Sequence, residues 1–218
     1  YYNEETIPSL YINQHRPGLE LVDVRRALAH AFDYPDITEK AMDGYSSVIE
    51  PSLMIFDYEK ALIDHSQIRD LQWSYNPEKA IDILEGIGAM PGADGIRVLP
   101  DGTRLGPWQV QCPAGWSEWN ATIEMAVQNA RQVGIELVSS FTEWGVYDNN
   151  KSTGNFDIIM DTPAAYSTPG GALKRAYSLM FSENVAPIGE AAYWNYGRFH
   201  SDRANDIIKA IGQTSDTT

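Results

Sequence analysis

Cysteine, basic residues and long apolar runs are scarce in this 218-residue sequence, and each scarcity excludes a class of protein. Cys112 is the only cysteine, which excludes an internal disulfide framework and a zinc site built from thiolates. Only 16 Lys and Arg residues stand against 30 Asp and Glu residues, and this net charge of −14 argues against nucleic-acid binding and against docking on an anionic membrane surface. No apolar run approaches the ~18 residues of a membrane-spanning helix.

Motifs for catalysis are equally scarce. The sequence has no Walker-type phosphate loop, no G-x-G-x-x-G after an expected strand and no G-x-S-x-G elbow. His15, His30, His65 and His200 do not form a short metal-ligand pattern, so neither a metal nor a cofactor is expected. We interpret His30, on an expected helix, as a structural histidine, and Cys112 as a small buried apolar residue.

The composition is that of a globular protein. Hydrophobic residues make up 43% of the chain and charged residues 21%, which is enough for a sizeable core. Because there is no repeat, low-complexity tract or obvious linker, we expect residues 1–218 to form a single domain. The chain opens with Tyr1-Tyr2-Asn3, without Met or a signal peptide, so we expect a processed product or an excised piece of a longer protein.

The spacing of apolar residues predicts several helices. Val24, Ala27 and Ala31 recur three and four positions apart, the period of a helix with one buried face. Asn76 and Ser117 are candidate N-caps, because their side chains can accept hydrogen bonds from free amide groups. We predict helices over residues 22–32, 36–42, 77–87, 117–133, 143–149, 172–181 and 204–211.

Other segments predict strands. Gln109 and Gln111 alternate with apolar residues over 108–112, as in a strand with one face in water. Pro100-Asp101-Gly102 predicts the turn of a β-hairpin. Strands alternating with helices predict an α/β fold, with a mixed sheet flanked by helices. The expected strand segments are a hairpin over 96–105, the strand at 108–112, a strand at 135–141 and a buried strand at 156–160.

Aromatic residues lie at the ends of these predicted elements. In an α/β sheet the crevice at the strand ends binds ligands, and Trp116 follows one strand and opens the longest helix. A tryptophan face suits the apolar face of a pyranose ring. The competing interpretation is that each tryptophan packs in the core. It is weaker for Trp116 and Trp119 as a pair, because Gly115 can place both at a helix mouth.

Acidic residues allow a second class of function. Glu118 and Glu124 flank the tryptophan cluster, and Glu143 precedes Trp144. Two carboxyl groups at a suitable separation could hydrolyse a glycoside. Primary spacing does not establish that geometry, and a solvated acidic surface is the favoured interpretation. A third possibility is a module with a purely structural role.

Six segments, in order along the chain, carry a family signature when they are taken together: residues 8–13, 22–33, 76–80, 100–102, 130–135 and 195–199. The arginine-rich helix with a trailing Asp, at 22–33, is the most specific of them. Together they resemble the extracellular solute-binding proteins, family 5, of ABC importers, which bind peptides, nickel or oligosaccharides. The resemblance implies one lobe of a type II periplasmic-binding-protein-like fold, and it implies capture of a solute between two lobes without chemistry, so no enzyme is expected.

The resemblance also implies site residues. The loop at 44–46 and the segment at 115–119 resemble the subgroup that binds cello-oligosaccharides. This implies that Trp116 and Trp119 are sugar platforms and that Asn13 is a hydrogen-bonding residue at a strand end. The predicted ligand-binding residues are Trp116, Trp119, Asn13, Tyr45 and Trp144.

Oligopeptide binding is the alternative within the same family. Peptide-binding relatives place an Asp in the loop after the strand that corresponds to residues 156–160, where it meets the peptide amino group. Residues 162–171 contain no acid here, although Asp161 stands just before them. This departure favours an oligosaccharide such as a cellodextrin over an oligopeptide.

The resemblance finally implies partners and a place in the cell. The expected partners are a small solute and, through the full-length protein, the membrane subunits of an ABC permease, with no nucleic acid. We expect a monomer located in the periplasm or outside the cell, and lipid anchoring or membrane association of the full-length protein is compatible with this. Residues 1–218 alone would hold one wall of the ligand cleft, so we expect them to bind ligand weakly or undetectably.

Overall fold

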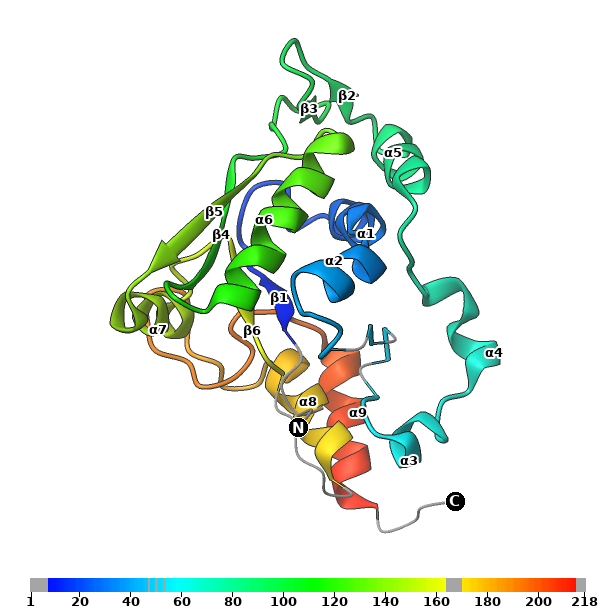
Figure 1. The fold of residues 1–218 in the computed structure, drawn as a ribbon. Helices are drawn as coiled ribbons and strands as arrows, with labels where there is room; N and C mark the ends of the chain where they lie inside the picture. Colours follow the sequence, from blue (N-terminus) through cyan, green and yellow to red (C-terminus); the bar gives the residue numbers. More distant parts are fainter. Residues whose placement is uncertain (1–7, 47, 50, 53, 164–169, 215–218) are drawn as a thin grey trace.

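The computed structural model of the chain describes residues 8–46, 48–49, 51–52, 54–163 and 170–214 (Figure 1). Its centre is a four-stranded sheet in the order β1-β6-β4-β5. The strands are β1 (Ser9–Ile12), β4 (Trp108–Pro113), β5 (Leu137–Thr142) and β6 (Ile158–Asp161). β4 is parallel to both of its neighbours, whereas β1 is antiparallel to β6, so the predicted mixed sheet is confirmed.

Alternate residues of each strand divide the core between the two faces of the sheet. Val110 and Ile158 pack on one face with α1 (Val22–Ala31) and α6 (Ser117–Gln132). Ile159 packs on the other face with Phe156 and with Tyr147 of α7 (Trp144–Thr153). α5 (Pro77–Gly86) lies outside α1, away from the sheet (Figure 1). The predicted α/β layering is therefore present, with helices on both faces.

The sheet face that packs against α7 is less exposed to water than the sequence predicts. Gln109 is exposed, as expected of a strand with a wet face, but Gln111 is only 6% exposed. The Asn150 amide of α7 donates a hydrogen bond to Gln111 Oε1 at 3.0 Å. The prediction of a solvated Gln111 was wrong, because alternation along one strand does not reveal that a helix covers the polar side.

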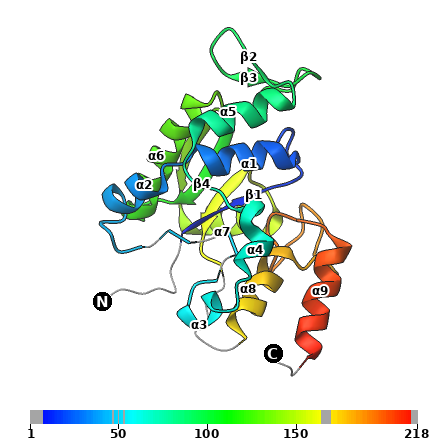
Figure 2. The same ribbon diagram turned by 90° about the vertical axis from the view of Figure 1, so that its right-hand side faces the viewer.

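The predicted helices are all present with shifted ends. Asn76 caps α5 as predicted, since its side chain accepts a hydrogen bond from the Lys79 amide at 3.0 Å. The N-cap of α6 is Trp116, with Ser117 the first helical residue, so the predicted Ser117 cap is wrong. The remaining predicted helices are α2 (Tyr34–Lys40), which starts two residues before its predicted start, α8 (Gly171–Met180) and α9 (Asp202–Gln213). α8 and α9 lie side by side (Figures 1 and 2).

Two residues have the structural roles expected of them. The His30 side chain is 6% exposed, and its Nδ1 lies 2.9 Å from the Ser74 carbonyl oxygen. Cys112 is fully buried in the main core. Both side chains are therefore buried and have structural roles.

The remaining elements are small. The predicted hairpin over 96–105 is present as a bridge between Val98 and Arg104. Backbone hydrogen bonds from Leu99 to Thr103 and from Leu105 to Arg97 lie on either side of this bridge. Residues 164–169 of the predicted loop at 162–171 lie outside the described residues. In the described chain, no helix has both the length and the hydropathy needed to cross a bilayer. The small elements are β2 (Met90–Pro91), β3 (Arg97–Val98), α3 (Asp57–Lys60), α4 (His65–Ile68) and the 3₁₀-helix η1 (Arg69–Leu71), and of these only β3 lies within a predicted element.

Candidate functional site

The carboxyl ends of the three parallel strands meet at one edge of the sheet. Pro113 of β4 pairs with Thr142 of β5 where both strands end. The register of β6 against β4 places Asp161 level with Pro113. Because ligands of open α/β sheets bind outside the carboxyl ends of the strands, the candidate site consists of the side chains that follow these three positions.

Trp116 stands at this edge, after β4. Gly115 has φ +84°, a conformation that glycine adopts without strain, and the turn it makes brings Trp116 to the N-cap of α6. The Trp116 side chain is 37% exposed. Its ring centroid lies 4.8 Å from that of Trp119 and 5.5 Å from that of Trp144. Trp116 is therefore the centre of an aromatic cluster at the strand ends.

Trp144 follows β5 in the same way. It is the first residue of α7 and is 52% exposed. The rings of Trp116 and Trp144 are tilted by 32° to each other, and both residues are partly open to solvent. Tyr147, one turn along α7, lies beneath Trp144 at 5.7 Å, and its hydroxyl donates a hydrogen bond to the Met160 carbonyl at 2.8 Å. Tyr147 therefore fixes α7 to the end of β6.

Trp119 differs from the other two tryptophans. It is 8% exposed and belongs to the core formed by α1 and α6. Its ring meets that of Trp116 edge to face, at 83°. Trp119 therefore packs against Trp116 and, unlike Trp116 and Trp144, is buried in the core.

Asn13 lies at the opposite edge of the sheet. β1 is antiparallel to β6 and pairs Ile12 with Ile158, so Asn13 follows β1 where the other strands begin. It is 1% exposed, and its amide donates hydrogen bonds to the carbonyl oxygens of Gly154 and Phe156. Asn13 therefore braces the start of β6, and the structure does not bring it to the tryptophans at the carboxyl ends of the strands.

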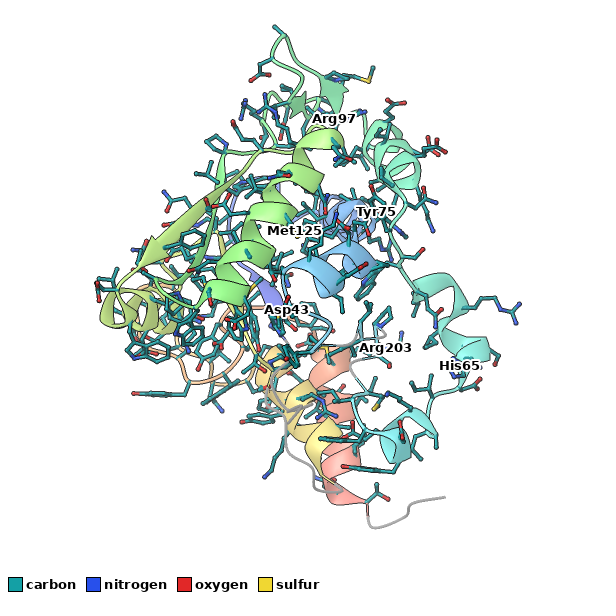
Figure 3. All side chains as sticks on the ribbon, viewed as in Figure 1. Asp43, His65, Tyr75, Arg97, Met125 and Arg203 are labelled. Carbon is teal, nitrogen blue, oxygen red and sulfur yellow. The ribbon has the colours of Figure 1, made fainter. Side chains whose placement is uncertain are left out.

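Tyr45 also lies apart from the tryptophans. It is 65% exposed, and no ring contact described for the chain joins it to them. Figure 3 shows Asp43, two residues earlier, well away from α7. A separate hollow of about 520 Å³ lies on this side, between β1, α1 and α2, and its mostly apolar lining includes Ser46 and Val48. Tyr45 therefore lies beside a residue that lines this hollow and has no ring contact with the three tryptophans.

Lys151 and Tyr196 belong to the site but were not predicted. The Lys151 ammonium group lies 3.0 Å from the Asp161 carboxylate and 5.2 Å from the centroid of the Tyr196 ring. Burial is the largest single influence and would lower the pKa of Lys151, but the charge and hydrogen bond of Asp161, together with Tyr196 and Asp148, raise that pKa above its ordinary value. Trp144, Tyr147 and Lys151 are spaced three and four residues apart, so a helical projection of α7 could have suggested this face.

The acidic residues of the hydrolase alternative lie on the surface. Glu118, Glu124 and Glu143 are all exposed. Backbone and Ser117 hydrogen bonds lower the pKa of Glu118, whereas a general acid for glycoside hydrolysis needs a raised pKa. Within the described residues, no group of three or more His, Cys, Asp or Glu side chains is placed to hold a metal ion. The site offers ring faces and hydrogen-bonding groups, which are suited to binding.

Comparisons with known proteins identify the family and the fold. Residues 2–180 match the model of the bacterial extracellular solute-binding proteins, family 5 Middle. No curated protein sequence matches the chain. Among solved structures, the chain resembles the periplasmic oligopeptide-binding protein of an oligopeptide ABC transporter from Thermotoga maritima, with a TM-score of 0.86, 20% identity and 97% of this chain covered.

Two further structures show the same fold. The chain superposes on the mannohexaose-bound form of the Thermotoga maritima protein with a TM-score of 0.87 and 22% identity over 97% of its length. It superposes on NikZ from Campylobacter jejuni, in complex with Ni(L-His), with a TM-score of 0.81 and 18% identity over 99%. The chain covers only 39% of each Thermotoga chain and 40% of NikZ, so it spans about two fifths of the length of these proteins.

Proposed function

The chain belongs to the bacterial extracellular solute-binding proteins, family 5, and on that premise we propose that it forms one lobe of a two-lobe protein that captures an oligosaccharide for an ABC importer. The whole of residues 1–218 is assigned to this lobe. The full-length protein delivers the solute to the membrane subunits of the permease, from the periplasm or the cell exterior, and acts as a monomer.

The paired rings of Trp116 and Trp144 carry this proposal. They are 37% and 52% exposed, lie 5.5 Å apart and stand at the carboxyl ends of neighbouring parallel strands. Indole faces suit the C–H face of a pyranose, and consecutive sugar units can lie along two such rings. Trp119 and Tyr147 support the rings from the two cores on either side of the sheet, so the platform is held before the ligand arrives.

Capture follows from closure of two lobes. A solute that contacts both lobes stabilises the closed form, and its affinity depends on the difference between its contacts in the open and closed forms. The rings on this chain provide one wall of the cleft. The solute leaves unaltered, because this chain's part in the process is to bind and orient it.

The neighbouring structures support both an oligosaccharide and the alternative of an oligopeptide. The Thermotoga maritima protein has been crystallised with mannohexaose, and AppA from Bacillus subtilis with a nonapeptide. On this chain the Asp161 carboxylate is already paired with Lys151 at 3.0 Å, whereas the tryptophan rings remain open to solvent. These two observations favour the oligosaccharide.

A thermal-shift experiment on the full-length protein tests the proposal. A ligand that prefers the native state raises the melting temperature. We expect cellotetraose or mannohexaose to raise it, with oligopeptides giving a smaller shift, and we expect chromatography to recover the sugar at its original length. Absence of a shift with every sugar would refute the oligosaccharide assignment, and shortened sugar would favour the hydrolase alternative.

A further inference from the structure

The ammonium group of Lys151 is enclosed at the strand ends. The Lys151 side chain is 12% exposed, although lysine side chains are rarely buried. Its Nζ lies over three aromatic rings, 5.8 Å from the centroid of the Trp144 ring, 5.3 Å from that of Tyr147 and 5.2 Å from that of Tyr196. Two of these rings belong to α7 and the third belongs to the segment that follows α8, so the enclosure joins two parts of the chain.

Carboxylates complete the enclosure. Asp161 lies 3.0 Å from Lys151 Nζ and Asp148 lies 3.6 Å from it. The Asp161 side chain is 16% exposed, so the closer of the two ion pairs is largely shielded from water. By contrast, Lys40 and Asp36 form an ordinary surface pair at 2.7 Å with side chains 65% and 36% exposed.

Aromatic faces and a carboxylate around one point are the chemistry that recognises an ammonium ion. In a receptor such a cage is open to a ligand cation. In this lobe the chain's own lysine fills the cage, directly beside the Trp144 ring that is assigned to the solute. A cationic group of a solute would therefore have to displace Lys151 from Asp161 before it could use this subsite.

We propose that the Trp144, Tyr147, Tyr196 and Asp161 cage is a primary-ammonium subsite that Lys151 occupies, and that Lys151 is thereby a specificity-determining residue which excludes solutes with a cationic end. This inference rests on the proposed function and deepens it. The free amino terminus of a peptide is refused at this position, whereas a neutral sugar is accepted on the adjoining rings.

Chemical rescue of the full-length protein tests the cage. Lys151→Ala removes the atoms that propylammonium would replace. We expect propylammonium chloride to raise the melting temperature of Lys151→Ala by several degrees more than sodium chloride or 1-propanol does, because the ion refills the cage. Lys40→Ala, which opens an exposed pair, should show no such difference. Equal shifts from propylammonium and 1-propanol in Lys151→Ala, or an equal response of Lys40→Ala, would overturn the proposal.

A peptide pair tests the consequence for specificity and uses the wild-type protein as well. The wild type should bind a tetrapeptide and its N-acetylated form with similar, weak affinity, whereas Lys151→Ala should favour the free amine by about tenfold. A strong preference of the wild type for the free amine would overturn the proposal even if the variant failed to fold. Binding of cellotetraose to the wild type is measured in the same experiment. Absence of sugar binding would refute the proposed function, whereas the peptide comparison tests the cage independently.

Discussion

Replacing Trp116 by Ala in the full-length protein is the sharpest single perturbation of the proposed site. The residue is 37% exposed, and a tryptophan buries up to about 250 Å², so a covering sugar would remove about 90 Å² of it from water. At roughly 25 cal/mol per Å² this area corresponds to about 2 kcal/mol as an upper value. Partial coverage gives about 1–2 kcal/mol, a loss of affinity of about 5- to 30-fold.

Isothermal titration with cellotetraose measures this loss. Trp73→Ala is the matched control, because Trp73 is 40% exposed but lines the separate hollow near α1. We expect the control to bind the sugar as the wild type does. Circular dichroism must show that both variants are folded. An unchanged dissociation constant for a folded Trp116→Ala, or an equal loss in Trp73→Ala, would refute the argument that this ring receives the solute.

Other predictions concern the stability of the lobe. The buried ion pair of Arg175 and Glu59 joins α8 to α3, so Arg175→Met should lower the free energy of unfolding by about 3–5 kcal/mol in urea titrations. Burial would raise the pKa of Glu59, but the hydrogen bonds from Arg175 and the backbone prevail and lower it. The stability that this gives is present above the unfolded pKa and is lost as the pH falls. The difference in free energy of unfolding between the wild type and Glu59→Gln should therefore narrow below about pH 4.5, and a constant difference would contradict this. Gly115→Ala should lower the free energy of unfolding by about 1–2 kcal/mol, because Gly115 has a φ of +84°. Gly145→Ala in α7 is the control and should not lower it, so equal effects of the two changes in urea titrations would argue against strain at the turn. Burial raises the pKa of Cys112 to about 12, so iodoacetamide at pH 8 should alkylate it only after unfolding, and rapid alkylation of the native protein would contradict its burial.

The elements that the sequence predicts well are those with local signals. α1, α5 and α6 have apolar residues at helical spacing, and the Asn76 cap depends on a residue three positions away. Trp116 and Trp144 were placed at strand ends for the same reason, because each follows a strand directly. Local patterns therefore sufficed to predict that both rings lie at the strand ends.

The features that the sequence could not supply depend on tertiary arrangement. Asn13 follows a strand as Trp116 does, but the antiparallel direction of β1 places it at the opposite edge. Trp119 shares its segment with Trp116, yet its position on α6 turns it into the core. The cage around Lys151 joins residues from α7, β6 and the segment after α8, and no short-range spacing connects all of these.

Titration of the full-length protein with cellotetraose in a calorimeter, followed by chromatography of the recovered sugar, distinguishes capture of an oligosaccharide from its alternatives. We expect saturable binding at one site and a tetrasaccharide that is recovered intact. Absence of binding heat under conditions where an oligopeptide binds, or recovery of shorter sugars, would contradict this expectation.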